Sequence, residues 1–296
     1  MQIIKDKIEE YLQEINHQKA QDIISSIQMG KMLRSRLILS IAPSSERGVE
    51  LCAIVEMIHL ASLLHDDVID TSATRRGKAS INAQYGNHTA IMLGDILYSL
   101  AFSKLTTLQP EIAQRLSRSV MLLSVGEFMD VELSHTINTD KDLYLEMTYK
   151  KTSSLIEACA YCAGILAGKD ATRLGEFGKN LGICFQLIDD MLDIFGDESK
   201  LGKPNFGDFK EGKTTLIYIF LLQCCNEVDR QFVKNLFQKE LYISDKCTLL
   251  AMIEKYNLKE ISKDYIKNFE KKATDLLLGD EVELQALLQK TITRDY

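Results

Sequence analysis

The sequence has few residues that interrupt helices and no excess of positive charge. It contains three prolines in 296 residues, and the long stretches rich in Leu, Ile, Met and Ala favour helices over strands. Lysines and arginines number 35 against 42 aspartates and glutamates, a net charge of −7 with a pI near 5.4. This balance argues against nucleic acid as the main partner. Because 46% of the residues are hydrophobic, we expect an all-α protein with a large core.

Signals for a membrane span, for secretion and for disulfides are also missing. The sequence has no run of about 18 apolar residues, and its N-terminal residues do not resemble a signal peptide. We therefore expect a cytoplasmic protein without stable membrane insertion. The cysteines number seven, and Cys159 and Cys162 form a Cys-x-x-Cys without a second pair of that spacing. We interpret all of them as reduced core residues.

An acidic motif, Asp66-Asp67-x-x-Asp70, follows directly on an apolar run. On a helix, Asp66 and Asp70 share a face, and Asp67 lies about 100° round from them. Like charges this close repel one another, and a bound cation would relieve the repulsion. Oxygen ligands without Cys or His among them suit Mg²⁺. Alone, this motif could equally be the solvated acidic end of a helix.

The same spacing recurs at Asp189, Asp190 and Asp193, within an apolar helical run from Leu181 to Phe195. Exposed acidic residues usually have polar neighbours, whereas both of these clusters emerge from core-like sequence. A solvated surface therefore explains the pair of motifs poorly. The repeat favours a site for divalent metal ions that takes ligands from both motifs.

Basic residues cluster at two places in the same part of the chain. Residues 30–36, Gly-Lys-Met-Leu-Arg-Ser-Arg, open an apolar run, and cations at the start of a helix suit a diphosphate. Arg75 and Arg76 follow the first acidic motif, and arginine forks suit bidentate contacts to phosphate. His59 precedes Asp66 by two helical turns, so both face a similar way. Taken alone, these features could be a solvated basic patch and a buried core histidine.

Together, the two acidic motifs and these cations resemble the trans-isoprenyl diphosphate synthases, the head-to-tail prenyltransferases. The resemblance runs from about Gly30 to Lys213. It implies an all-α, single-domain helical bundle of the isoprenoid synthase type over residues 1–296, with a central active-site cavity, and a homodimer. It also implies three Mg²⁺ ions. They would assist loss of pyrophosphate from an allylic diphosphate, and the double bond of isopentenyl diphosphate would attack the resulting cation.

The resemblance assigns roles to individual residues. Metal ligands would be the six carboxylates Asp66, Asp67, Asp70, Asp189, Asp190 and Asp193. Catalytic residues would be Asp66, Asp70, Asp189, Lys151 and Lys213. Substrate-binding residues would be Lys31, Arg34, His59, Arg75, Arg76, Lys151, Thr152, Gln186, Lys203 and Lys213. This sequence departs from the family pattern at Ser35, Phe206 and Thr214, where Pro, Gly and Pro are common, so we expect local backbone differences there.

Small residues precede the first acidic motif. Positions four, five and eight before Asp66 hold Ser62, Ala61 and Ile58, and no aromatic residue lies in 51–64. One helical turn rises about 5.4 Å, comparable to one extended isoprene unit. Short-chain members of the family carry a bulky aromatic residue at the fourth or fifth position. The resemblance is therefore closer to medium- and long-chain synthases, such as octaprenyl diphosphate synthase. We expect hexaprenyl to octaprenyl products for quinone side chains, made from a farnesyl primer.

Four other interpretations stay open at this point. A short-chain synthase would stop at farnesyl or geranylgeranyl diphosphate. A terpene cyclase shares the ionisation step, but it would normally replace the second acidic motif with a mixed Asn/Ser/Glu motif. A non-catalytic subunit of a heteromeric synthase would tend to lose acids or arginines from these motifs, and none is missing here. A helical metal-binding protein without catalysis would not need the accompanying cations.

Overall fold

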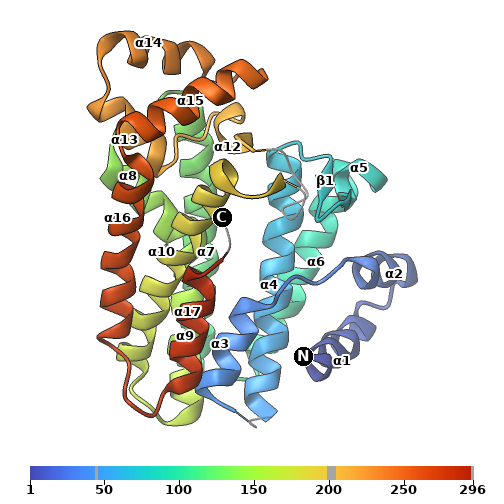
Figure 1. Cartoon of the computed structure of the whole chain (residues 1–296). Helices are drawn as coiled ribbons and strands as arrows, with labels where there is room; N and C mark the ends of the chain where they lie inside the picture. Colours follow the sequence, from blue (N-terminus) through green and yellow to red (C-terminus); the bar gives the residue numbers. More distant parts are fainter. Residues whose placement is uncertain (44–45, 199–204, 295–296) are drawn as a thin grey trace. The chain divides into compact units, whose positions relative to one another are not determined.

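The computed structural model describes residues 1–43, 46–198 and 205–294 (Figure 1). Helices dominate these residues, as composition predicted. The described chain divides into two compact units: unit 1 comprises Met1–Met121 and Leu155–Gly178, and unit 2 comprises Leu122–Ser154 and Lys179–Tyr296. Two long helices, α7 and α10, contribute residues to both units. The expectation of a single domain stays a prediction.

Unit 1 holds most of the helices from the first half of the chain. Its elements are α1 (Gln2–Leu12), the 3₁₀ helix η1 (Gln13–Ile15), α2 (Gln18–Ser26), α3 (Leu33–Ile41), α4 (Glu46–Ile69), β1 (Thr74–Arg75), β2 (Lys78–Ala79), α5 (Ile81–Tyr85), α6 (Asn87–Leu105), the start of α7 (Pro110–Ser134), nearly all of α9 (Ser154–Ala167) and the start of α10 (Ala171–Phe195).

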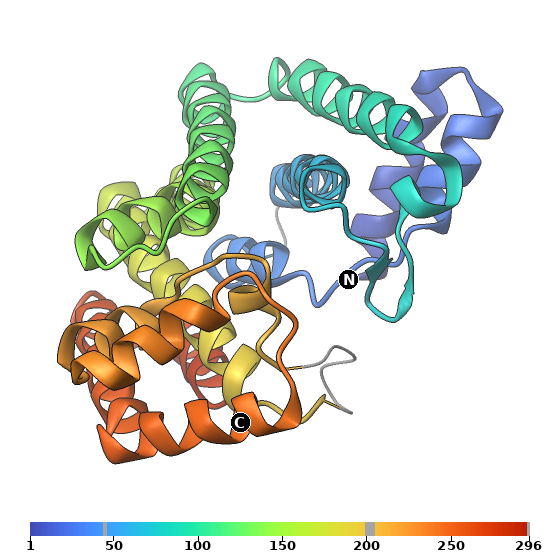
Figure 2. The same ribbon diagram turned by 90° about the horizontal axis from the view of Figure 1, so that it is seen from above.

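The α4 helix is the core element of unit 1. It is apolar almost all round, and α1, α3 and α6 pack against it (Figures 1 and 2). Its side chains Leu51, Ile54 and Ile58 have no exposed surface. By length and hydropathy, α4 alone among the described helices could cross a membrane, but 67% of that window is buried inside the protein. A helix that is apolar on every side is expected to be buried.

A short antiparallel hairpin follows α4 and was not predicted from the sequence. Arg75 pairs with Lys78 across β1 and β2. The residues between them, Arg76 and Gly77, have φ values of 53° and 73°. Two successive left-handed residues form the tight turn whose twist matches a hairpin. This turn separates the adjacent Arg75 and Arg76, which have different partners.

Unit 2 holds the elements of the second half of the chain. They are the end of α7, α8 (Lys141–Thr148), the π-helical turn η2 (Tyr149–Ser153), the end of α10, α12 (Gly207–Lys210), α13 (Leu216–Cys224), α14 (Glu227–Leu236), α15 (Ile243–Lys255), α16 (Leu258–Thr274) and α17 (Val282–Ile292). Helix α8 begins at Asp140, whose carboxylate accepts the backbone N–H groups of Asp142 and Leu143. This cap satisfies donors that have no partner within the helix.

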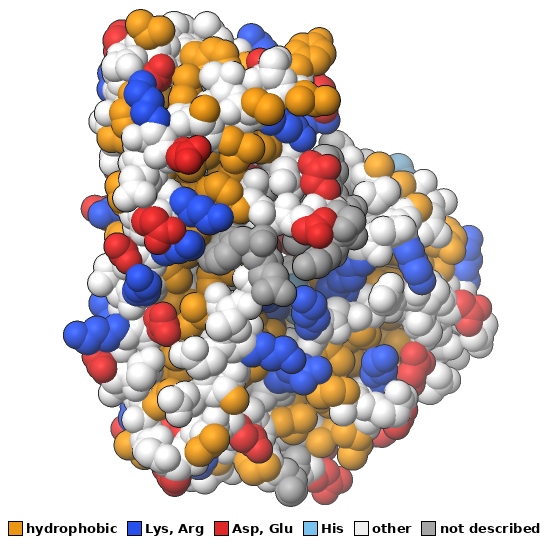
Figure 3. Space-filling model, viewed as in Figure 1, with side chains coloured by type: hydrophobic (Ala, Val, Ile, Leu, Met, Phe, Trp, Pro, Cys, Tyr) orange, Lys and Arg blue, Asp and Glu red, His pale blue; other side chains and the backbone are white. Residues whose placement is uncertain are grey.

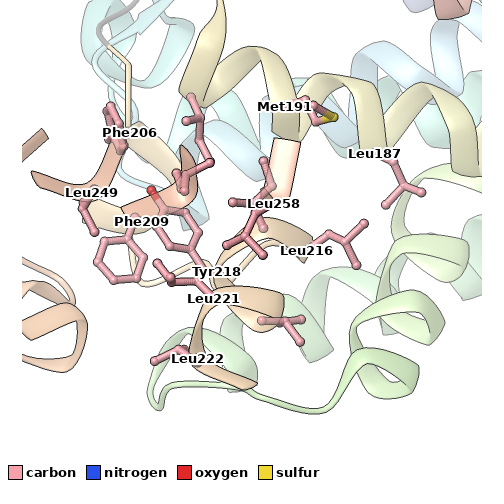
Figure 4. Close-up of a cluster of buried hydrophobic side chains, with 14 of the residues drawn as sticks. Leu187, Met191, Phe206, Phe209, Leu216, Tyr218, Leu221, Leu222, Leu249 and Leu258 are labelled. Carbon is pink, nitrogen blue, oxygen red and sulfur yellow. The ribbon is translucent and has the colours of Figure 1, made fainter. Parts of the chain in front are cut away.

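The core of unit 2 forms around α10, α12 and α13 (Figure 4). The rings of Phe209 and Tyr218 stack there with centroids 4.2 Å apart. Phe206 has a φ of 67°, a backbone conformation that favours glycine, yet its ring is buried among this cluster. Burial of an aromatic ring offsets the strain of about 1–2 kcal/mol. The departure from the family's glycine is therefore accommodated by packing.

The exposure of the cysteines and of one hydrophobic surface differs from that of the core. All seven cysteines are free, as predicted, but Cys224 and Cys247 are exposed, so the prediction that all of them are core residues was wrong. On unit 2, hydrophobic side chains lie at the surface over α14 and α15 (Figure 3). Residues of this surface include Val228, Tyr242 and Ile243, each more than three-quarters exposed.

Candidate active site

The first acidic motif closes α4, and its three carboxylates have different surroundings. Asp66 and Asp70 are half-buried, whereas Asp67 is only 2% exposed. Asp67 accepts a fork from Arg75, with Nε 2.8 and 2.9 Å from its two oxygens and Nη2 2.7 Å from Oδ1. Helix α4 ends at Ile69, and Thr71 just beyond it has a φ of 51°. Asp67 is thus committed to holding the hairpin, which leaves Asp66 and Asp70 as the motif's accessible pair.

Three arginines surround His59 in unit 1, and we call these four residues the cation cluster. It contains Arg34 on α3, His59 on α4, and Arg75 and Arg76 on the hairpin. Burial lowers the pKa of His59 well below 6.5, and the charges of Arg34, Arg76 and Arg75 lower it further. His59 is therefore a neutral hydrogen-bonding group at physiological pH. Burial also lowers the pKa of Arg34, and its Nε is buried without a hydrogen-bond partner.

Gly30 allows the two basic segments to meet. A side chain at this position would place its Cβ 2.5 Å from Nη2 of Arg76. The guanidinium of Arg76 also donates to the carbonyl of Gln28. This contact explains why the basic motif begins with glycine. Lys31 is exposed at the surface of unit 1.

Ser35, the residue that replaces proline, makes a specific contact. Its hydroxyl donates to Oε1 of Glu56 at 2.6 Å, and both residues are buried. Burial raises the pKa of Glu56, while the Ser35 hydrogen bond and the charges of Arg34 and Arg76 lower it in part. Glu56 is the buried counter-charge of the cation cluster, and sequence reasoning missed it because a single Glu in an apolar helix carries no motif.

The second acidic motif, within α10, has the same sequence spacing as the first, but its third aspartate is buried. Asp189 is exposed, and its Oδ1 lies 2.9 Å from Nη1 of Arg294, which follows α17. Asp190 and Asp193 are buried. Asp193 accepts the backbone N–H of Asp208 at 3.2 Å and so anchors the start of α12. Only Asp189 of this motif presents its carboxylate at the surface of unit 2.

The lysines at 150 and 151 lie in the π-helical turn η2, which bulges at this point. Gly126 on α7 permits the close approach, because a Cβ there would lie 2.2 Å from the backbone nitrogen of Lys151. The Lys151 ammonium contacts Glu127 at 2.7 Å and also Asp130. Burial lowers the pKa of Lys151, but these carboxylates more than reverse the effect, so it stays protonated. Glu127 and Asp130 are both buried against Lys151.

A cavity of about 170 Å³ opens in unit 2 beside these groups. Its lining includes the polar residues Tyr144, Lys151, Thr152, Gln186, Asp190 and Lys213. Four of them were predicted as substrate-binding residues, and one as a metal ligand. Tyr144 was not predicted, because a single tyrosine in a helical pattern is indistinguishable from core. Thr214 also lines the cavity, and its hydroxyl accepts the backbone N–H of Asn138 at 3.3 Å. Lys203 lies outside the described residues.

The donor set fits divalent metal ions such as Mg²⁺. Across the described parts of the chain, no three His, Cys, Asp or Glu side chains converge on a point that would hold a metal ion unaided. The accessible carboxylates are Asp66 and Asp70 of unit 1 and Asp189 of unit 2. Mg²⁺ takes one or two carboxylates plus substrate phosphate oxygens and water. Within each unit, these carboxylates therefore fit ions that are completed by a bound diphosphate.

The residues at the predicted chain-length positions differ in exposure. Ile58 and Ala61 are wholly buried in the core of unit 1. Ser62 is half-buried, and its hydroxyl donates to the carbonyl of His59 at 2.9 Å. Of the three, only Ser62 therefore reaches the surface of the unit.

An all-α fold with paired acidic motifs and phosphate-type cations defines a class of diphosphate-processing enzymes. The polyprenyl synthetase family description matches residues 16–253. The chain is 34% identical to the geranylgeranyl diphosphate synthase of Sulfolobus acidocaldarius over 259 residues, which is 81% of this chain and 78% of that protein. It is 41% identical to the octaprenyl diphosphate synthase of Escherichia coli over 172 residues, which is 57% of this chain and 53% of that protein.

Solved structures agree with these sequence matches. The octaprenyl pyrophosphate synthase from Helicobacter pylori superimposes with a TM-score of 0.94 and 40% identity, and the match covers 98% of this chain and 97% of that one. The chain therefore belongs to the polyprenyl synthetase family, and it is a prenyltransferase of the trans-prenyl diphosphate synthase type. The predicted resemblance, the all-α fold and the enzyme class are confirmed. Because its relatives include geranylgeranyl and octaprenyl synthases, the family does not fix the length of the product.

Proposed function

We propose that this enzyme condenses isopentenyl diphosphate with an allylic diphosphate, farnesyl diphosphate, in a Mg²⁺-dependent reaction. The proposal rests on the different burial of the aspartates within each acidic motif. In both motifs the middle aspartate is buried on protein donors, while Asp66, Asp70 and Asp189 remain accessible. Carboxylates arranged in this way suit the binding of a metal–diphosphate complex.

In the proposed reaction the allylic C–O bond breaks and the bonding electrons leave with pyrophosphate. The double bond of isopentenyl diphosphate then attacks the allylic carbon, and a proton leaves to the departing pyrophosphate. Asp66, Asp70 and Asp189 would hold Mg²⁺ (three ions, by family resemblance), which supplies Lewis-acid stabilisation of the leaving group. Lys151 remains charged and binds the allylic diphosphate together with Arg75 and Lys213.

The cation cluster of unit 1 would bind isopentenyl diphosphate. Arg34 and Arg76 supply charge, Lys31 adds a cation at the rim, and the neutral His59 supplies a hydrogen bond. The buried Nε of Arg34 has no protein partner, which suits a group that awaits an anionic ligand.

The test is pyrophosphate release from purified protein with farnesyl and isopentenyl diphosphates and Mg²⁺. Release that requires both substrates is expected. Release from farnesyl diphosphate alone would indicate a terpene cyclase, and no release would indicate a non-catalytic subunit. Asp66→Ala and Asp189→Ala should each lower turnover at least about 100-fold with unchanged helical circular dichroism. Asp264→Ala, an exposed position on α16, is the matched control and should keep full turnover.

We propose that the products are longer than geranylgeranyl diphosphate. Hexaprenyl to octaprenyl diphosphates would supply quinone side chains. The small residues Ala61 and Ser62 support this proposal, because neither would block a growing tail one turn below Asp66. Chromatography of the dephosphorylated products tests it. A wild-type product of farnesyl or geranylgeranyl length would favour the short-chain alternative instead.

We further propose a cytoplasmic homodimer. Helix α6 exposes Ile91 and Met92, and α7 exposes Met121, all within unit 1. Apolar side chains on neighbouring helices suit the contact with a second copy. Light scattering should give about twice the 33.5 kDa of one chain. A mass equal to that of one chain would contradict the dimer.

A further inference from the structure

A chain of hydrogen bonds crosses the cavity of unit 2. The hydroxyl of Tyr144 on α8 donates to Oδ2 of Asp190. The amide nitrogen of Gln186 donates to Oδ1 of the same carboxylate at 2.9 Å. The hydroxyl of Thr152 in turn donates to Oε1 of Gln186 at 2.8 Å. All four side chains line the cavity, and Tyr144 and Asp190 are buried.

The direction of these hydrogen bonds is fixed by Asp190. A carboxylate oxygen accepts, so the NH₂ group of Gln186 must face Asp190, and its carbonyl oxygen must face Thr152. Thr152 must then donate its only hydroxyl hydrogen to Gln186. A proton on the Asp190 oxygen that faces Tyr144 would leave this direction unchanged, because Gln186 contacts the other oxygen. Thr152 can then offer a ligand in the cavity only its oxygen lone pairs, because its one hydroxyl hydrogen is used.

We propose that Tyr144 and Asp190 are positioning residues, which orient Gln186 and Thr152 toward the allylic substrate, and that Asp190 does not ligate metal. This inference rests on the proposed function of the site. Asp190 has both oxygens occupied by protein donors, whereas its neighbour Asp189 is exposed. The hydroxyl of Thr152, held as an acceptor, favours positive charge on the allylic group as its bond to diphosphate breaks.

Two substitutions test the chain of hydrogen bonds from opposite ends. Tyr144→Phe removes one donor, and we expect about a 10-fold loss of kcat, with the KM for isopentenyl diphosphate within about 2-fold of the wild type. Asp190→Asn offers an NH₂ group to Gln186, which must flip its amide and reverse the polarity at Thr152. We expect a loss of about 100-fold in kcat. The double variant should lose no more than Asp190→Asn alone, because both changes break one chain.

Tyr218→Phe is the matched control. Tyr218 lies in the same unit, and its hydroxyl is as deeply buried but has no hydrogen-bond partner. Its removal should leave kcat within about 2-fold of the wild type. The two Tyr→Phe variants remove the same atom from buried rings, so melting temperatures will show whether any loss of kcat reflects folding.

A binding measurement separates positioning from metal ligation. The melting temperature is recorded against Mg²⁺ concentration in the presence of pyrophosphate, without turnover. Asp190→Asn should keep the wild-type midpoint within about 2-fold, whereas Asp189→Asn should raise it about 10-fold or more. An Asp190→Asn midpoint that moves with Asp189→Asn would overturn the inference, as would equal kcat for Tyr144→Phe and Tyr218→Phe. If the wild type released no pyrophosphate, the proposed function itself would fail.

Discussion

His59 offers a direct test of the electrostatics of unit 1. Burial and the charges of Arg34, Arg76 and Arg75 hold its pKa well below the ordinary value of 6.5. The folded protein therefore keeps the imidazole neutral, whereas the unfolded chain binds a proton as the pH falls through 6.5. Above pH 6.5 the titration of His59 does not change the free energy of unfolding, and below pH 6.5 it lowers the free energy of unfolding progressively. Replacement by glutamine, which does not titrate, should remove this part of the pH dependence.

The size of the effect follows from linkage. With an unfolded pKa of about 6.5, protonation of the unfolded chain at pH 5.5 costs the folded state at most about 1.4 kcal/mol relative to pH 7.5. Urea unfolding at both pH values should therefore show the wild type losing more stability than His59→Gln, by up to about 1.4 kcal/mol. Glu56, one turn away on α4, has its pKa raised by burial, and it titrates in both proteins. The comparison between the two proteins thus isolates His59.

Kinetics provide the second measurement on this residue. In the proposed binding of isopentenyl diphosphate, neutral His59 contributes a hydrogen bond and not a charge, so His59→Gln should keep the KM for this substrate within about 3-fold. His59→Ala should raise it about 10-fold. His88→Gln, at an exposed position on α6, is the control for both assays. Identical pH dependence of unfolding in the wild type and His59→Gln would refute a neutral, buried imidazole.

Four further substitutions have defined outcomes. Arg294→Ala should lower the Mg²⁺ concentration for half-maximal activity about 2- to 5-fold, because the guanidinium no longer competes at Asp189; a higher requirement would mean that Arg294 assists the metal. Ser62→Phe should shorten the product with little change in stability, whereas Ala61→Phe, at a wholly buried site, should also cost about 1–3 kcal/mol in unfolding free energy. Unchanged product lengths in both variants would show that the growing prenyl tail does not pass this part of α4. Ser35→Ala should cost about 1–3 kcal/mol and raise the KM for isopentenyl diphosphate more than that for the allylic substrate; equal KM changes would give Ser35 a purely structural role.

The positions where this chain departs from its family show how packing can replace a backbone rule. Ser35 stands in place of proline and gains a buried hydrogen bond to Glu56. Phe206 takes a left-handed conformation that glycine would adopt freely, and its ring joins the core of unit 2. Thr214 lies buried and accepts a hydrogen bond from the backbone. None of these partners could be found from the sequence, because each lies far along the chain.

Sequence alone determined the helical class, the two acidic motifs and most cations of the site. These features depend on local rules: the spacing of aspartates along a helix, the scarcity of proline, and the placement of basic residues at the start of apolar runs. The same rules placed the second acidic motif on a helix, and the apolar run from Leu181 to Phe195 forms the second part of α10. They also showed that both motifs emerge from core-like sequence.

Tertiary structure decided which members of each motif are available for chemistry. Spacing places Asp67 on a different face of the helix from Asp66, but it does not show that Asp67 is bound by the guanidinium of Arg75. Nor does it show that Asp190 accepts a hydrogen bond from Tyr144 of a different helix. Burial and hydrogen-bond partners arise from segments distant in sequence, so they belong to the folded chain and not to the motif.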